Sequence, residues 1–107
     1  MTVSPNDFLS LINKWRSESR SIEVILATKS LLLHFRCSVD EVESDGFTLK
    51  SESGKLSVSL GRATLEYIDP RESSPELRPA LEDKYVCCLE MRGASVGRLA
   101  LFEVRED

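Results

Sequence analysis

The feature that most constrains this chain is the stretch 22–68, in which apolar and polar residues alternate and turn residues recur. Strict alternation is typical of half-buried β-strands, and β-branched residues suit a pleated surface. The pattern is present over residues 22–28, 31–42, 47–50, 56–60 and 63–67. The stretch therefore predicts a meander of antiparallel strands, and it contains no catalytic signature.

One irregularity is expected inside this meander. In the segment 31–42 the alternation slips before Val42, and one extra residue at Asp40-Glu41 would restore it. The sequence therefore predicts a β-bulge at that point. The residues before the bulge that share one face, and that should point into the core, are Leu33, Phe35 and Cys37.

The N-terminal segment predicts a helix. Ser4 is a good N-cap, and Pro5 suits the first helical position. One apolar stripe follows at helical spacing, formed by Phe8, Leu11, Ile12 and Trp15. A helix of about three turns is marginal alone in water, so this one is expected to dock on the sheet and cover apolar strand surface.

Two further strands are expected at 85–92 and 96–104. These strands and the first two carry apolar residues on both faces, which requires cover on both faces. We therefore place the helix against the first, second and last strands, with the central hairpin facing water. The predicted fold is α+β: one domain over residues 1–107, with an N-terminal helix packed on a bent antiparallel sheet or small barrel of about six strands.

Charge and cysteine content narrow the classes of partner and compartment. The 18 acidic and 14 basic residues give a net charge of −4, which argues against non-specific nucleic-acid binding. No apolar run approaches the roughly 20 residues that a membrane span needs. Three cysteines, an odd number, argue against a disulfide framework, so a reducing cytoplasm is expected.

The residue types that usually carry catalysis or bind metals form no recognisable site. His34 is the one histidine, and a catalytic role would need a serine and an acid in a geometry that sequence cannot show. The acidic residues at Asp40, Glu41, Glu43 and Asp45 do not have the spacing of a calcium loop. We therefore expect no catalytic, cofactor-binding or metal-binding residues and a protein that is not an enzyme.

Three arginines are the candidate binding residues. Arg62 and Arg92 each adjoin a glycine at a bend, which could direct them toward an anionic partner, and Arg98 follows on the last strand. Ion pairing with surface carboxylates is the alternative interpretation. The segment 69–83 carries three prolines and is expected to be a loop that is either functional or mobile.

A helix followed by bent antiparallel strands, with Met91-Arg92-Gly93-Ala94-Ser95-Val96 between the last two, resembles the layout of Sm-like RNA-binding barrels. The resemblance implies that the Arg-Gly at this turn helps to contact a nucleotide. The chain departs from that family in its additional hairpin at 55–68 and in lacking the aspartate-plus-asparagine signature of an earlier loop.

Two functional hypotheses follow. The first is a non-enzymatic binding or assembly module that presents a sheet face, or the 69–83 loop, to a protein partner. The alternative is a small RNA-binding barrel that uses Arg62, Arg92 and Arg98. Apolar surface that one short helix cannot cover also predicts a homodimer formed through the last strand. Some of the following four residues are expected to be uncovered in a monomer: Leu32, Val86, Leu99 and Leu101.

Overall fold

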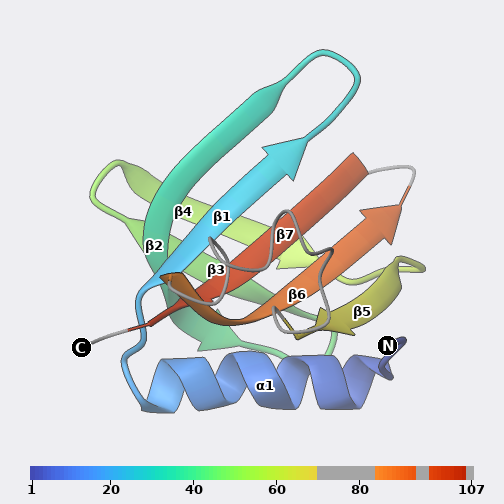
Figure 1. The fold of residues 1–107 in the computed structure, drawn as a ribbon, viewed down its shortest axis with the longest axis horizontal. Coiled ribbons are helices and arrows are strands. Elements are labelled where there is room, and N and C mark those ends of the chain that lie inside the picture. The colour runs from blue at the N-terminus through green and yellow to red at the C-terminus, as the bar shows by residue number, and fades with distance from the viewer. Residues whose placement is uncertain (70–83, 94–96, 106–107) are drawn as a thin grey trace.

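A computed structural model describes residues 1–69, 84–93 and 97–105. The elements are α1 (Pro5–Ser17), β1 (Ile22–Ala27), β2 (Leu32–Val42), β3 (Gly46–Ser51), β4 (Gly54–Ser59), β5 (Thr64–Ile68), β6 (Tyr85–Gly93) and β7 (Gly97–Val104). The strands form one antiparallel sheet in the order β4-β3-β2-β1-β7-β6-β5, and α1 packs across one end of it (Figure 1). The predicted α+β fold is confirmed, with seven strands instead of about six and no closure into a barrel.

The N-terminal helix begins as the sequence predicts. The Ser4 hydroxyl accepts a hydrogen bond from the Asp7 N–H at 3.2 Å, and Pro5 occupies the first turn. The residues of α1 that are buried against the sheet are Phe8, Leu9, Ile12 and Trp15. Leu11, which belongs to the predicted stripe, is only partly buried, while Leu9 on its flank packs in the core.

The predicted bulge in β2 is confirmed. Val39 pairs with Leu49 and Glu41 pairs with Thr48, so one residue of β2 is left over between them. Such a bulge bends the strand. We attribute to this bend the position of β3 and β4, which fold over toward the helix.

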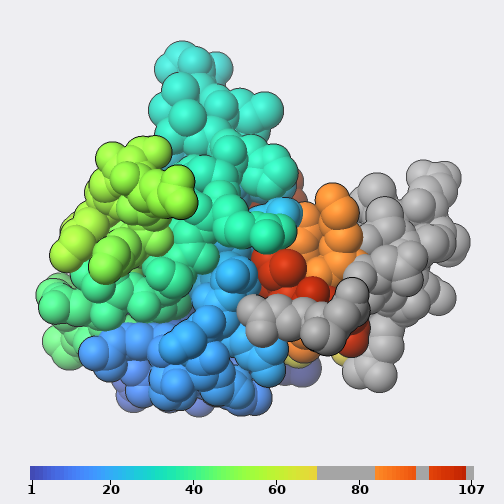
Figure 2. Space-filling view, turned by 90° about the vertical axis from the view of Figure 1, so that its left-hand side faces the viewer, coloured from blue at the N-terminus to red at the C-terminus, as the bar shows by residue number. Residues whose placement is uncertain are grey.

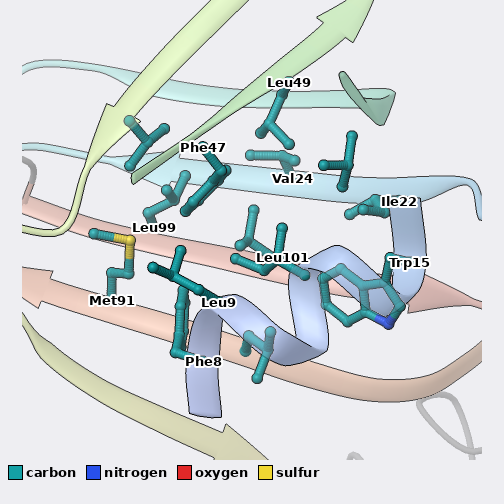
Figure 3. Packing of buried hydrophobic residues seen from close by; sticks show 14 of the residues in the cluster. Phe8, Leu9, Trp15, Ile22, Val24, Phe47, Leu49, Met91, Leu99 and Leu101 are labelled. Atoms are coloured by element: carbon teal, nitrogen blue, oxygen red, sulfur yellow. The ribbon is translucent and has the colours of Figure 1, made fainter. Parts of the chain in front are cut away.

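The prediction that the central hairpin faces water is therefore wrong. Phe47 and Leu49 on β3 and Val58 on β4 are buried, and the Phe8 and Phe47 rings lie 6.4 Å apart between centroids. The helix packs against β2, β3 and β5, and not mainly against the first and last strands. The core lies between α1 and the face of the sheet that α1 covers, which we call the inner face (Figure 3).

The last strand lies inside the sheet. β7 pairs with β1 on one side and with β6 on the other, so it is not an edge. Leu99 and Leu101 are fully buried, so of the four residues named as candidates only Leu32 and Val86 remain exposed, at 72% and 40%. Strand order therefore excludes a homodimer formed by edge pairing of the last strand.

One polar contact joins the helix to β7. The Trp15 indole N–H donates to Glu103 Oε1 at 2.7 Å, and Arg20 Nε lies 3.6 Å from Glu103 Oε2. A buried carboxylate is costly unless it is paired and hydrogen-bonded. Glu103 thus holds the end of α1 against the sheet.

The adjacent cysteines point to opposite faces, as expected on a strand. Cys87 belongs to the core, whereas Cys88 lies on the outer face, which is the face opposite α1. A second bulge, between Tyr85 and Cys87, moves Tyr85 to the outer face, against the predicted alternation. Burial raises the pKa of both thiols to about 12, so both stay protonated at neutral pH.

Candidate functional site

Two of the three predicted arginines meet on the outer face. Arg92 on β6 lies directly opposite Arg98 on β7. Both contact the same side chain, Glu90, which is 1% exposed. Arg98 Nη2 lies 3.0 Å from Glu90 Oε2, and Arg92 Nε contacts Oε1. The arrangement is a triad in which two guanidinium groups share one buried carboxylate.

Glu90 is the residue of this cluster that the sequence analysis missed. The available signal was a lone acidic residue inside an otherwise apolar run, followed two residues later by an arginine. The carboxylate raises the pKa of Arg92 through a hydrogen bond and its charge. A buried carboxylate needs such partners, so ion pairing accounts for Arg92 and Arg98 without a ligand.

Arg62 is not part of this triad. It lies in the turn after β4, where Gly61 adopts φ +52°. Because Thr64 pairs with Arg92, this turn lies at the same end of the sheet. Within the described residues the ion pairs of Glu90 are with Arg92 and Arg98, and none joins it to Arg62.

A second polar cluster surrounds Glu23 on the outer face. Arg36 Nη2 donates to Glu23 Oε1 at 3.2 Å, and His34 Nε2 lies 3.5 Å from Oε2. The Tyr85 hydroxyl also donates to Oε2. This hydrogen bond is the main reason that the pKa of Glu23 lies below its ordinary 4.5, and Arg36 and His34 lower it further. His34 is thus one of three side chains that contact the Glu23 carboxylate, and no serine of the described chain hydrogen-bonds to it.

The Tyr85–Glu23 contact predicts a defined dependence of stability on pH. Burial, and then the hydrogen bond to Glu23, raise the pKa of Tyr85 from 10.0 to about 12. The stabilisation from protonated Tyr85 is therefore complete below pH 10 and lost as the pH rises toward 12. The stabilisation from ionised Glu23 is complete above pH 4.5 and lost as the pH falls through its lowered pKa.

Tyr85→Phe is accordingly expected to lower the free energy of unfolding by about 1 kcal/mol at neutral pH, since one hydrogen bond to a charged group is lost. The difference from the parent protein should shrink below pH 4.5 and above pH 10. Urea denaturation across this range measures it. In the Glu23→Gln background, the loss of stability caused by Tyr85→Phe should be nearly the same above and below pH 4.5. If this loss still shrank below pH 4.5 in that background, Glu23 would not be the acceptor of the Tyr85 hydrogen bond.

Of the acidic residues at positions 40–45, Asp40 forms an ion pair with a lysine of β4. Asp40 Oδ2 lies 3.0 Å from Lys55 Nζ. In the described ranges no group of three histidine, cysteine, aspartate or glutamate side chains is placed to hold a metal ion.

The part of the inner face that α1 does not cover contains an apolar groove of about 340 Å³. We call it the open groove. Its apolar lining comes from four strands and consists of Leu26, Leu33, Phe35, Leu49 and Leu56. Residues in and beside the β3–β4 turn also line it, among them Ser53 and Lys55. Leu33 and Phe35, which were predicted to be core residues, are exposed and half-buried respectively, because they line this groove.

Next to the open groove, the hairpin of β1 and β2 projects beyond the rest of the sheet (Figures 1 and 2). Its tip carries three consecutive leucines, Leu31, Leu32 and Leu33, with exposed fractions of 49%, 72% and 41%. Leu33 lines the groove, whereas Leu32 is the next residue on the strand and faces the other side of the sheet. Single exposed leucines are ordinary, but several exposed leucines beside an apolar groove often mark a binding surface. The hairpin tip and the open groove together are the candidate site.

Comparison with family models, with curated proteins and with solved structures gave no match to this chain. No helix in the described residues is long and apolar enough to cross a membrane. The predicted 69–83 loop lies, except for Asp69, outside the described residues.

Proposed function

We propose that this chain is a non-enzymatic binding module that engages a protein partner through the hairpin tip and the open groove. The observation that carries the proposal is the set of three consecutive exposed leucines beside a groove with an apolar lining. Small-molecule sites are usually more enclosed and offer convergent polar groups, whereas this surface is open and apolar. The free, buried cysteines support a reducing compartment such as the cytoplasm.

A second copy of this chain is one partner that could occupy the same surface. Sedimentation equilibrium at micromolar concentration distinguishes a second copy from another protein as the partner. The RNA-binding alternative remains a prediction from the sequence. It is less well supported, because Arg92 and Arg98 are both ion-paired with Glu90.

The proposal predicts that binding depends on Leu33. Selection from a phage-displayed library of random peptides should yield sequences that bind the parent protein and bind Leu33→Ser at least about tenfold more weakly. Val86→Ser is the matched control, since Val86 is 40% exposed on a strand distant from the groove and Leu33 is 41% exposed. Equal loss in both variants, or no enriched peptide together with a purely monomeric protein, would refute the proposed function.

A further inference from the structure

The open groove lies between two hairpins of the sheet. Leu33 and Phe35 line it from the β1–β2 hairpin, whereas Leu49 and Leu56 line it from the β3–β4 hairpin. The position of one hairpin relative to the other therefore sets the width of the groove and the apolar surface that it offers. A site that is already held in its binding geometry loses less conformational entropy when a partner binds. The contacts that hold the two hairpins in place are thus part of the binding site.

The two hairpins are joined by a short ladder that contains the bulge. β3 pairs with β2 only over residues 38–42, and the bulge between Val39 and Glu41 lies inside this range. Over residues 32–37 the one neighbour of β2 in the described chain is β1, and we call this half of β2 the free edge. Because a bulge bends its strand, the angle between the hairpins is set at the bulge.

Asp40 is the residue that the bulge leaves without a partner on β3. Its two polar groups are held by other elements instead. The Asp40 carbonyl accepts a hydrogen bond from Arg16 Nε at 3.0 Å, and Arg16 belongs to α1. The Asp40 carboxylate Oδ2 lies 3.0 Å from Lys55 Nζ, and Lys55 belongs to β4. One residue thus connects the bent strand to the helix and to the β3–β4 hairpin.

The contact between Asp40 and Lys55 reaches across a strand. In the sheet β4 is separated from β2 by β3, so main-chain pairing cannot join these two residues. Lys55 itself lines the open groove. The hydrogen bond to Asp40, and then the charge of Asp40, raise the pKa of Lys55, as expected for a close ion pair. The pair therefore ties the groove side of the β3–β4 hairpin to the bulge.

The strength of this ion pair suits positioning better than global stability. The Lys55 side chain is 61% exposed and that of Asp40 is 24% exposed, and ion pairs at such exposure add little to the stability of a fold. The pair is therefore not needed to keep the sheet folded. A small difference in free energy is still enough to change the populations of two hairpin positions by about two- to fivefold.

We propose that Asp40 is a positioning residue of the open groove. Through Arg16 and Lys55 it fixes the angle between the β1–β2 and β3–β4 hairpins, and it thereby holds the groove at the width that a partner requires. The inference rests on the proposed function and adds to it how the binding surface is held in shape.

The test measures the separation of the two hairpins directly, without a partner. Spin labels are attached at Ser30→Cys in the tip of the β1–β2 hairpin and at Ser53→Cys in the β3–β4 turn, and both serines are exposed. Double electron–electron resonance then gives the distribution of distances between the labels. The native cysteines are buried, and burial raises the pKa of Cys37 to about 11 and those of Cys87 and Cys88 to about 12, so they resist labelling at neutral pH.

Asp40→Asn removes the charge that pairs with Lys55 and keeps the carbonyl that binds Arg16. It should widen the distance distribution by about 1.5-fold or more, and Lys55→Gln should do the same. The double variant should be no wider than either single variant, because both changes break the same contact. Glu41→Gln is the matched control, since it removes the same charge from the neighbouring residue, and it should leave the distribution unchanged.

Salt and the helix provide two further readouts. Raising sodium chloride from about 0.05 M to about 1 M screens an exposed ion pair, so the parent distribution should widen toward that of Asp40→Asn. The distribution of Asp40→Asn itself should change little with salt. Arg16→Gln takes away the donor to the Asp40 carbonyl and should also widen the distribution. The urea midpoints of these variants should stay close to that of the parent protein, which separates positioning from a loss of folding.

Binding is measured separately, with an uncharged peptide from the phage selection. Its affinity should fall by about two- to fivefold in Asp40→Asn and stay at the parent value in Glu41→Gln. An unchanged distance distribution in Asp40→Asn or Arg16→Gln, or equal widening in Glu41→Gln, would overturn the positioning role. A wider distribution with unchanged peptide affinity would overturn it as well. If the selection gives no peptide that depends on Leu33, the proposed function fails, while the distance measurement still decides whether Asp40 sets the hairpin angle.

Discussion

Trp15→Ala is expected to lower the free energy of unfolding by about 3–5 kcal/mol, the usual cost of truncating a large core aromatic. Trp15 is 2% exposed and lies near the end of α1, where its ring packs against the sheet (Figure 3). Its removal also takes away the indole N–H that donates to the buried Glu103 carboxylate. Guanidinium chloride denaturation followed by circular dichroism measures the loss, since Trp15 is the only tryptophan.

Two variants separate the packing effect of Trp15 from its hydrogen bond. Trp15→Phe keeps an aromatic ring but leaves Glu103 without the indole donor, so an intermediate loss of about 1–3 kcal/mol is expected. Leu32→Ala, at a site that is 72% exposed, should change stability by no more than about 0.5 kcal/mol. A Trp15→Ala protein as stable as Leu32→Ala would mean that α1 is not docked on the sheet as described.

Phe47→Ala is expected to be comparably damaging, again by about 3–5 kcal/mol. Phe47 is 2% exposed on β3 and packs near the Phe8 ring of α1. Phe35→Ala should cost clearly less, because Phe35 is half-buried in the wall of the open groove and solvent already reaches it. The two free energies of unfolding can be compared in the same denaturant series. A larger loss for Phe35→Ala would support the layout with a solvent-facing central hairpin.

The local sequence pattern was sufficient to predict the helix, the strands and the bulge. Ser4 and Pro5 mark the helix start because capping is a contact between neighbours in sequence. The bulge between Val39 and Glu41 was predictable because side chains of a strand alternate between its two faces. One inserted residue therefore moves the apolar residues that follow it to the other position of the alternation. Arg62, Arg92 and Arg98 were predicted as candidate binding residues, but the sequence did not show that one buried glutamate would contact both Arg92 and Arg98.

The sequence by itself thus determined the helix, the strands and the bulge, while the order of strands and everything that depends on it were decided only by the tertiary structure. Alternation shows that a strand has a buried face, but several strand orders satisfy the same alternation equally well. Pairing β7 between β1 and β6 buries Leu99 and Leu101, which a sequence pattern cannot distinguish from exposed leucines. The free edge of β2 arises in the same way, because β3 is shorter than β2 and pairs with only the far half of it. Pairing partners are set by the packing of residues far apart in the chain, and that is information that no single stretch contains.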